Sequence, residues 1–378
     1  MMLAVTLSAY VARRFASSVL LLLAALTGLV ALFDFIELLR RAATRADAGF
    51  GIVVTIAALR LPFMMLQIIP FAILLGGIAA FWRLSRSSEL VVARAAGISA
   101  WGFLAGPLLV ALLFGGLSTV AISPLSSALL SQAERLDSTY LRNAGGITAL
   151  AGGRLWLRQA DRAIDPDGVA ILAGRPALPG RRGERAALRL EEASLWRLST
   201  ADKPLARVEA PSAVLLAGRW VLDNAVVFNA TQGNQNQAAP PARIELPTDL
   251  TPDRIEDSFA SPDTLSFWAL PEFIAVLESS GFSAVRHRLH YQSLLSLPVL
   301  AAAMALLAAS FSMRQARRGG VAQMIGLGVA AGFALFVLDR VAGELGETGT
   351  LPVVLAAWAP AAAGLMLALT MLLHLEDG

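Results

Sequence analysis

Six long apolar runs dominate this sequence. They cover residues 15–33, 61–82, 97–122, 294–311, 321–338 and 351–373. A helix needs about 20 predominantly apolar residues to cross a bilayer, and every run approaches or exceeds that length. The first run is longer than the apolar core of a secretory signal peptide, roughly 7–15 residues, and we expect it to be a retained span. Only 16% of the residues are charged, against about 25% in soluble domains. The sequence therefore predicts an α-helical membrane protein with six transmembrane helices in two groups of three.

The arginines in the short connections predict the orientation of these helices. With the N-terminus in the cytoplasm, the cytoplasmic segments hold Arg13, Arg14, Arg83, Arg86, Arg94, Arg314, Arg317 and Arg318. On the other side, the arginines are offset by acidic residues such as Asp34, Glu37 and Asp339. Arginine-rich loops stay in the cytoplasm. An even number of spans then places both termini in the cytoplasm, and the long segment between the third and fourth spans outside it.

That long segment, of about 170 residues, has a different pattern. Apolar residues alternate with polar ones in the stretches 154–159, 168–174, 186–198 and 206–228, with a turn expected near Gly218. Such alternation between turn residues is typical of β-strands, and several short strands indicate an antiparallel sandwich or open roll. We expect residues 1–123 to hold three spans and a cytoplasmic helix at about 84–96, residues 124–265 to form the β-domain, and residues 266–378 to hold a connecting helix and three more spans.

Common catalytic and cofactor motifs are absent from the sequence. It contains no GxxxxGK[ST] phosphate loop, no HExxH metal motif, no GxSxG nucleophile motif and no cysteine. His287 and His290 are three residues apart, but two ligands without a third are a weak metal signal. We therefore expect neither a catalytic residue, nor a cofactor site, nor a metal site on this chain.

Two charged segments stand out. LLRRAATR, at the end of the first span, brings together Arg40, Arg41 and Arg45. This cluster is either a solvated helix end or a site for the phosphates of an amphiphile, which arginine binds through paired donors. RLSRSSELVVARAAG, residues 83–97, lies between the second and third runs. It is longer than a turn requires and predicts a docking surface. A GxxxG pair, Gly328 and Gly332, predicts close helix packing in the fifth span.

Four stretches resemble a known family. FDFIELLRRA (33–42), LPFMMLQIIPFAILLGGI (61–78), SELVVARAAG (88–97) and GFALFVLDR (332–340) are similar to the LptF/LptG permease family. The resemblance covers essentially the whole chain and implies a β-jellyroll-like domain in the periplasm. It also implies a permease subunit of an ABC transporter that extracts lipopolysaccharide from the bacterial inner membrane. The implied partners are an LptF-like paralogous permease, an LptB-like ATPase dimer that binds the ATP and Mg²⁺, and LptC/LptA-like periplasmic β-jellyroll proteins; no nucleic acid partner is expected.

The resemblance also implies roles for individual residues. Glu89 matches a coupling-helix glutamate that faces the ATPase, and its neighbours Ser88, Leu90 and Arg94 belong to the same contact. Arg40 and Arg41 match basic residues that contact lipid A phosphates or core sugars, and Arg45 extends that cluster. Asp34 stands where the family has a basic residue, and Arg135 is the expected replacement.

Two further functions fit the composition without the resemblance. A stand-alone lipid flippase or secondary carrier would act without an ATPase, although such carriers usually keep ionisable groups at mid-membrane. A structural membrane anchor would tolerate changes at Glu89. For acyl chains in transit, a groove formed by Leu155, Trp156, Leu157 and Trp220 is the hypothesis for the β-domain.

Overall fold

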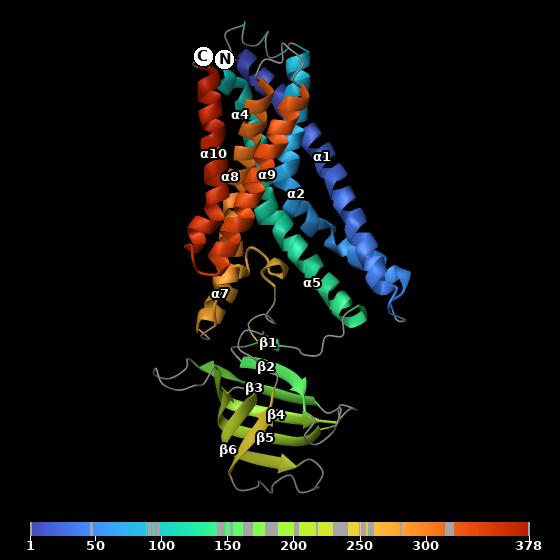
Figure 1. Cartoon of the computed structure of the whole chain (residues 1–378), viewed down its shortest axis with the longest axis vertical. Coiled ribbons are helices and arrows are strands. Elements are labelled where there is room, and N and C mark those ends of the chain that lie inside the picture. The colour runs from blue at the N-terminus through green and yellow to red at the C-terminus, as the bar shows by residue number, and fades with distance from the viewer. Residues whose placement is uncertain are drawn as a thin grey trace. The chain divides into compact units, whose positions relative to one another are not determined.

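The predicted spans are helices in the computed structural model (Figure 1). It describes residues 2–45, 48–87, 89, 92, 95, 99–141, 148–151, 154–161, 169–177, 188–199, 204–216, 218–229, 241–248, 250, 255, 261–279, 282–313 and 321–376. The chain divides into a helical unit, residues 1–141, 262–271 and 285–378, and a β unit, residues 142–261 and 272–284.

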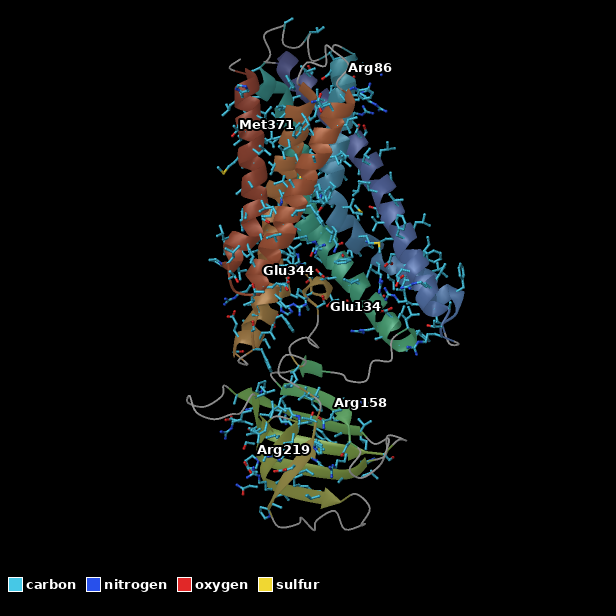
Figure 2. All side chains as sticks on the ribbon, in the orientation of Figure 1. Arg86, Glu134, Arg158, Arg219, Glu344 and Met371 are labelled. Carbon is cyan, nitrogen blue, oxygen red and sulfur yellow. The ribbon has the colours of Figure 1, made fainter. Side chains whose placement is uncertain are left out.

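The helical unit contains six helices of membrane-spanning length and hydropathy within the described residues. Its helices are α1 (Met2–Ala42), α2 (Phe50–Arg86), α4 (Ala100–Leu117), α5 (Ser123–Tyr140), α8 (Val285–Met313), α9 (Val321–Glu347) and α10 (Val353–Glu376), with a short 3₁₀ helix, η2 (Pro262–Thr264). The six predicted spans are confirmed, and the protein is a multi-pass membrane protein. Figure 2 shows Arg86 at one end of this bundle and Glu134 and Glu344 toward the other.

The third span is longer than its apolar run because α4 continues into α5 through a π-helical segment, η1 (Ser118–Ile122). Within it, the buried Thr119 hydroxyl donates a hydrogen bond of 2.7 Å to the carbonyl of Leu294 on α8. α5 then packs against α2. The continuation therefore carries residues 123–140 past the end of the apolar run as an amphipathic helix beside α2.

Glycines let the helices of this unit approach one another closely. A Cβ on Gly76 of α2 would lie 2.6 Å from the Cα of Val19 on α1. On α9, a Cβ on Gly328 would meet Ile78 at 2.5 Å, and one on Gly332 would meet Leu74 at 2.4 Å. The GxxxG pair is therefore a packing feature against α2, as the sequence predicted.

The β unit is built on one antiparallel sheet. Its described strands are β1 (Thr148–Ala151), β2 (Arg154–Ala160), β3 (Val169–Ala177), β4 (Leu188–Leu198), β5 (Pro204–Leu216), β6 (Arg219–Asn229) and β7 (Ala242–Pro247). The helix α7 (Leu270–Ser279) follows the sheet in the chain. Strands adjacent in sequence pair in the order β1 to β7. The predicted insertion of an antiparallel β-domain between the third and fourth spans is confirmed. The described strands form an up-and-down meander, and the jellyroll-like arrangement that the resemblance implies stays a prediction.

The two faces of the sheet differ in burial. Leu155, Leu157 and Trp220 are each 0–1% exposed and belong to the apolar core of the unit. Trp156 lies between the two leucines on β2, so its side chain stands on the opposite face, where it stacks on Trp196 with ring centroids 5.5 Å apart. The four residues of the hypothetical groove therefore do not share one surface.

Candidate functional site

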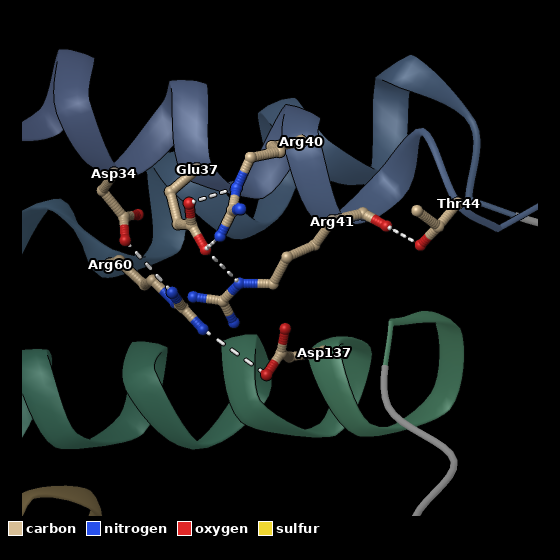
Figure 3. A network of polar contacts seen from close by, with 7 residues as sticks. All are labelled: Asp34, Glu37, Arg40, Arg41, Thr44, Arg60 and Asp137. Carbon is tan, nitrogen blue, oxygen red and sulfur yellow. Dashed lines mark hydrogen bonds and ion pairs between the residues drawn. The ribbon is translucent and has the colours of Figure 1, made fainter.

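Three helix ends meet around a small apolar cluster: the C-terminal end of α1, the N-terminal end of α2 and the C-terminal end of α5. Its buried members are Leu38, Ala42, Val53, Ile56, Ala133 and Leu141. The same three helices carry the charged residues of a polar network, which Figure 3 shows. The apolar contacts fix the helices, and the helices fix the positions of the charges.

Arg40 and Arg41, the two arginines predicted to contact substrate, share one carboxylate on α1. Glu37 accepts hydrogen bonds from Nε and Nη2 of Arg40, both at 2.9 Å, and from Nε of Arg41 at 3.1 Å. The spacings of three and four residues place all three side chains on one helix face. Exposed ion pairs contribute only about 0–1 kcal/mol. Glu37 therefore orients the two guanidinium groups more than it stabilises the helix, and it cancels one of their two charges.

Asp34, one turn earlier on α1, forms a separate and more buried network. Its Oδ1 lies 3.2 Å from Nη1 of Arg60 on α2, and Nη2 of Arg60 lies 3.6 Å from Oδ2 of Asp137 on α5. The three side chains are 19%, 13% and 2% exposed, respectively. One guanidinium thus joins two carboxylates from two other helices (Figure 3). Asp34 stands where the family resemblance implies a basic residue. Its carboxylate pairs with Arg60 inside the helical unit, so Asp34 has a structural role in this chain.

The other predicted contact residues lie elsewhere. Arg45 is exposed just beyond the end of α1. Arg135 is exposed on α5. Because it is two residues away from the buried Asp137, the two side chains lie on different sides of the helix. Within the described part of the chain, Arg40 and Arg41 share Glu37, and Arg135 is not part of that network. The structure brings together Arg40 and Arg41 but not the whole predicted set.

The sequence interpretation missed Arg60 and Asp137. Arg60 comes directly before the second apolar run, 61–82, and this position at the edge of a predicted span was the available signal. An arginine within a predicted membrane helix usually has a partner. The identity of its partners depends on tertiary packing, because Asp34 and Asp137 are distant in sequence.

An apolar surface adjoins the two arginines on α1. Leu29, Leu32, Phe33 and Ile36 are each more than half exposed. Exposed apolar side chains on a spanning helix face lipid, a partner helix or an amphiphilic ligand. A helix that carries this surface and ends in two oriented guanidinium groups matches a ligand with acyl chains and phosphates.

The predicted coupling segment is described only in part. Ser88, Leu90 and Arg94 lie outside the described residues. Glu89 is half-buried, and its Oε1 accepts a 2.8 Å hydrogen bond from the Ser87 hydroxyl. It also lines a cavity of about 240 Å³ that includes Arg14 and Arg83. The carboxylate therefore lies at the end of α2, near basic side chains of α1 and α2.

Among the described residues, no group of three or more His, Cys, Asp or Glu side chains could hold a metal ion. The ionisable groups of the two networks above are paired with one another as ions. Their arrangement suits binding and packing roles.

Comparison with known proteins gives a consistent result. The LptG protein of Escherichia coli K12, a lipopolysaccharide export system permease protein, is 24% identical over 381 residues, which is 97% of this chain and 98% of that protein. The corresponding LptG protein of Haemophilus influenzae is 22% identical over 373 residues, 94% of each chain. Both relatives are LptG proteins. The sequence also matches the family model described as lipopolysaccharide export system permease LptF/LptG over residues 9–374. The chain belongs to the LptF/LptG family of lipopolysaccharide export system permeases.

Proposed function

We propose that this chain is a permease subunit of an ABC transporter that extracts lipopolysaccharide from the inner membrane and passes it to a periplasmic bridge toward the outer membrane. The observation that carries the proposal is the family match across residues 9–374. A permease subunit moves a substrate and does not itself catalyse a reaction. In this proposal the chain holds no cofactor, and a separate LptB-like ATPase dimer binds the ATP and Mg²⁺.

The substrate contact that we propose is the end of α1. Arg40 and Arg41 would bind phosphates of lipopolysaccharide through paired N–H donors, and Arg45 would add charge at the same helix end. The exposed apolar surface of α1, including Leu32 and Phe33, would contact acyl chains, each buried CH₂ contributing about 0.8 kcal/mol. Because Arg135 does not contact Arg40 or Arg41, it would bind lipopolysaccharide at a second point along the transport path.

The coupling contact that we propose is the segment after α2. Glu89, with Ser88, Leu90 and Arg94, would dock into the ATPase and transmit its movement into α2 and α4. Arginine-rich connections support a cytoplasmic position for this segment and for both termini. The β unit would then lie in the periplasm and pass the lipid to LptC/LptA-like proteins, while an LptF-like permease would complete the path within the membrane.

Within the β unit, the acyl chains would follow the face that carries Leu155, Leu157 and Trp220. These side chains form a continuous apolar core, which would have to open to admit a lipid. Trp156 lies on the other face of the sheet and has no part in this path. Crosslinking from Leu157 that captures lipopolysaccharide, with none from Trp156, is the expected result.

The test is ATP-dependent release of lipopolysaccharide from proteoliposomes that hold the full chain with its co-purified subunits. We expect an ATPase to co-purify, Arg40→Glu/Arg41→Glu to lower substrate capture, and Glu89→Lys to uncouple ATP turnover from release. The matched control is Arg286→Glu/Arg288→Glu, which reverses two exposed arginines of α8. ATP-independent release would favour a stand-alone carrier, and normal coupled release by the Glu89 variant would refute the coupling role.

A further inference from the structure

A further candidate site lies on the outer face of the β unit, the face of the sheet that points away from the apolar core. It is a cavity of about 540 Å³ over β4, β5 and β6, in the size range of pockets that hold small ligands. Ser194 and Glu209 line it, and their neighbours in sequence, Leu195 and Val208, belong to the core. Because adjacent residues of a strand face opposite sides, this cavity is separate from the apolar face that we propose for acyl chains.

Three aligned bulges shape the sheet at this cavity. The β4–β5 and β5–β6 registers continue through the bulges without a shift, whereas pairing with β3 and β7 shifts there by one residue. Bulges bend a strand and redirect its side chains, and they are frequent beside functional sites. In each of the three strands, successive residues of the core are three positions apart instead of two: Leu190 and Ala193, Ala210 and Ala213, Leu222 and Ala225.

Two of these bulges hold a residue with a left-handed backbone. Glu192 of β4 has a φ of 50° and Asn224 of β6 a φ of 54°. Glycine adopts this conformation without cost, whereas a side chain such as glutamate rarely does. Among the non-glycine residues that the structure describes, these two alone have a positive φ, and both line the cavity. Backbone strain of this kind gathers at ligand sites, so the paired occurrence favours a binding role.

Arg154 of β2 brings a guanidinium with unused donors to the cavity. Its Nη2 donates a 2.9 Å hydrogen bond to the carbonyl of Glu192, and its Nε is buried without an acceptor within the described part of the chain. The Glu192 carboxylate pairs instead with Arg175 at 3.5 Å, and Glu209 pairs with Arg207. These ion pairs leave the positive charge of Arg154 without a counterion in the cavity.

The remaining lining combines an apolar floor with hydrogen-bonding groups. Val226 and Phe228 of β6 supply the apolar part, and the Ser194 hydroxyl and the Asn224 amide supply donors and acceptors. A sugar ring presents C–H groups on its face and hydroxyl groups at its edge, so it can satisfy both kinds of surface. The unneutralised Arg154 suits a sugar that bears a carboxylate or a phosphate. An acyl chain would leave the polar groups unsatisfied.

We propose that this cavity binds a saccharide unit with one acidic group, in the sugar part of lipopolysaccharide. The inference rests on the proposed export function, which supplies this ligand. Acyl chains then follow the inner face of the sheet and sugars the outer face. Phe228 on β6 is four strands from Trp156 on β2, about 19 Å along the sheet, so short-range crosslinking from Trp156 still captures no lipopolysaccharide.

The experiment measures binding of the lipid-free oligosaccharide released from lipopolysaccharide. The protein is the full chain with its co-purified subunits in mild detergent, and saturation-transfer NMR reports the binding of a small ligand to so large a complex. Maltohexaose is the uncharged comparison. We expect the acidic oligosaccharide to bind about tenfold more tightly than maltohexaose, and intact lipopolysaccharide to displace it.

Two variants on different strands test the lining. Asn224→Gly removes the amide but keeps a backbone that glycine adopts freely, so the Tm should hold while affinity for the oligosaccharide falls about three- to tenfold. Arg154→Gln should weaken the acidic oligosaccharide about tenfold and leave maltohexaose unchanged. The matched control is Arg158→Gln, the same substitution on the same strand and face, at an exposed residue outside the lining (Figure 2). It should change neither affinity.

Four results would overturn the proposal. Equal binding of the two saccharides, or unchanged binding by both variants, would remove the acidic-sugar site. Failure of intact lipopolysaccharide to displace the oligosaccharide would assign the site to another glycan. Loss of a co-purified subunit from the variants, with oligosaccharide binding intact, would assign it to a protein partner.

ATP-dependent release of lipopolysaccharide is measured separately on the same preparation. Absent oligosaccharide binding with normal release would refute the saccharide site alone. Normal oligosaccharide binding with absent release would refute the export function alone.

Discussion

Nη1 of Arg60 lies 3.2 Å from Oδ1 of Asp34, and this ion pair joins α2 to α1. The same guanidinium reaches Asp137 of α5 at 3.6 Å. Asp34 stands where the family resemblance leads us to expect a basic residue. In this chain the cation comes instead from the neighbouring helix, where it is largely buried and holds three helices together.

Arg60→Gln should therefore destabilise the helical unit. It would leave the carboxylates of Asp34 and Asp137 close together without their shared cation. Removing one partner of a buried ion pair typically costs about 3–5 kcal/mol, and the partial exposure of Asp34 and Arg60 lowers our expectation to about 2–3 kcal/mol. The measurement is the Tm of the purified protein in mild detergent, which should fall by several degrees.

Two variants test whether the loss comes from the uncompensated carboxylates. Arg60→Gln/Asp34→Asn removes one of them and should recover part of the Tm. Glu37→Gln breaks only exposed pairs and should change the stability by about 0–1 kcal/mol. A normal Tm for Arg60→Gln alone would show that the network contributes nothing to stability.

The sequence predicted the number and order of the spans because a membrane-length apolar run is a strong signal. It did not predict where the helices end. The first run covers residues 15–33, whereas α1 extends over Met2–Ala42, because polar residues beyond the apolar run continue the helix. The continuation of α4 through a π segment into α5 also has no simple signal, since it depends on packing against α8.

Strand alternation located most of the sheet, and the expected turn near Gly218 is present, with φ of 77° at that residue. The strand β7, Ala242–Pro247, was missed because its six residues follow a polar stretch and alternate weakly. The hypothesis of a groove for acyl chains placed Trp156 beside Leu155, although neighbouring residues of a strand face opposite sides. The order of pairing could not be predicted, because it is a tertiary property.

The arginine cluster on α1 was visible as a run of like residues, and its pairing with Glu37 follows from the helical spacing. The role of Arg60 was not visible, because its partners come from two other helices. A charge at the edge of a predicted span shows that a partner is needed, but only the fold identifies it.

Glu37→Gln should strengthen capture of a phosphate-bearing amphiphile at the end of α1. The substitution removes the carboxylate that binds Arg40 and Arg41, so the local charge rises by one and the N–H donors are released. Removal of a competing exposed pair corresponds to about 0.5–1 kcal/mol, or roughly two- to fivefold in affinity. Photocrosslinking of lipopolysaccharide from a probe near Arg40 would measure it. Weaker capture would mean that the orientation imposed by Glu37 matters more than the released charge.

Trp220 and Trp156 should respond very differently to truncation. Trp220 is fully buried in the core of the β unit, and Trp220→Ala should cost about 3–5 kcal/mol. Trp156 is 38% exposed, and Trp156→Ala loses mainly its stacking on Trp196, about 0.5–1.5 kcal/mol. Hydrogen exchange of peptides from β5 and β6 in the full chain would report both changes. Comparable effects of the two substitutions would contradict the assignment of the buried face.

Gly115 and Gly116 form a matched pair for testing how closely α4 approaches α8. A Cβ on Gly115 would lie 2.5 Å from the Cα of Pro298, whereas a Cβ on Gly116 would have no heavy atom within 4 Å. Gly115→Ala must push the two backbones apart and should destabilise the protein by about 1–3 kcal/mol, the usual cost of overpacking. Gly116→Ala adds the same methyl group to the same helix without a clash and should be neutral or slightly stabilising, because alanine favours the helix. Thermal unfolding in detergent compares the two directly, and since both variants share the same change in helix propensity, any difference in Tm measures the helix contact alone. Equal Tm values would show that α8 can move away from α4 at little cost.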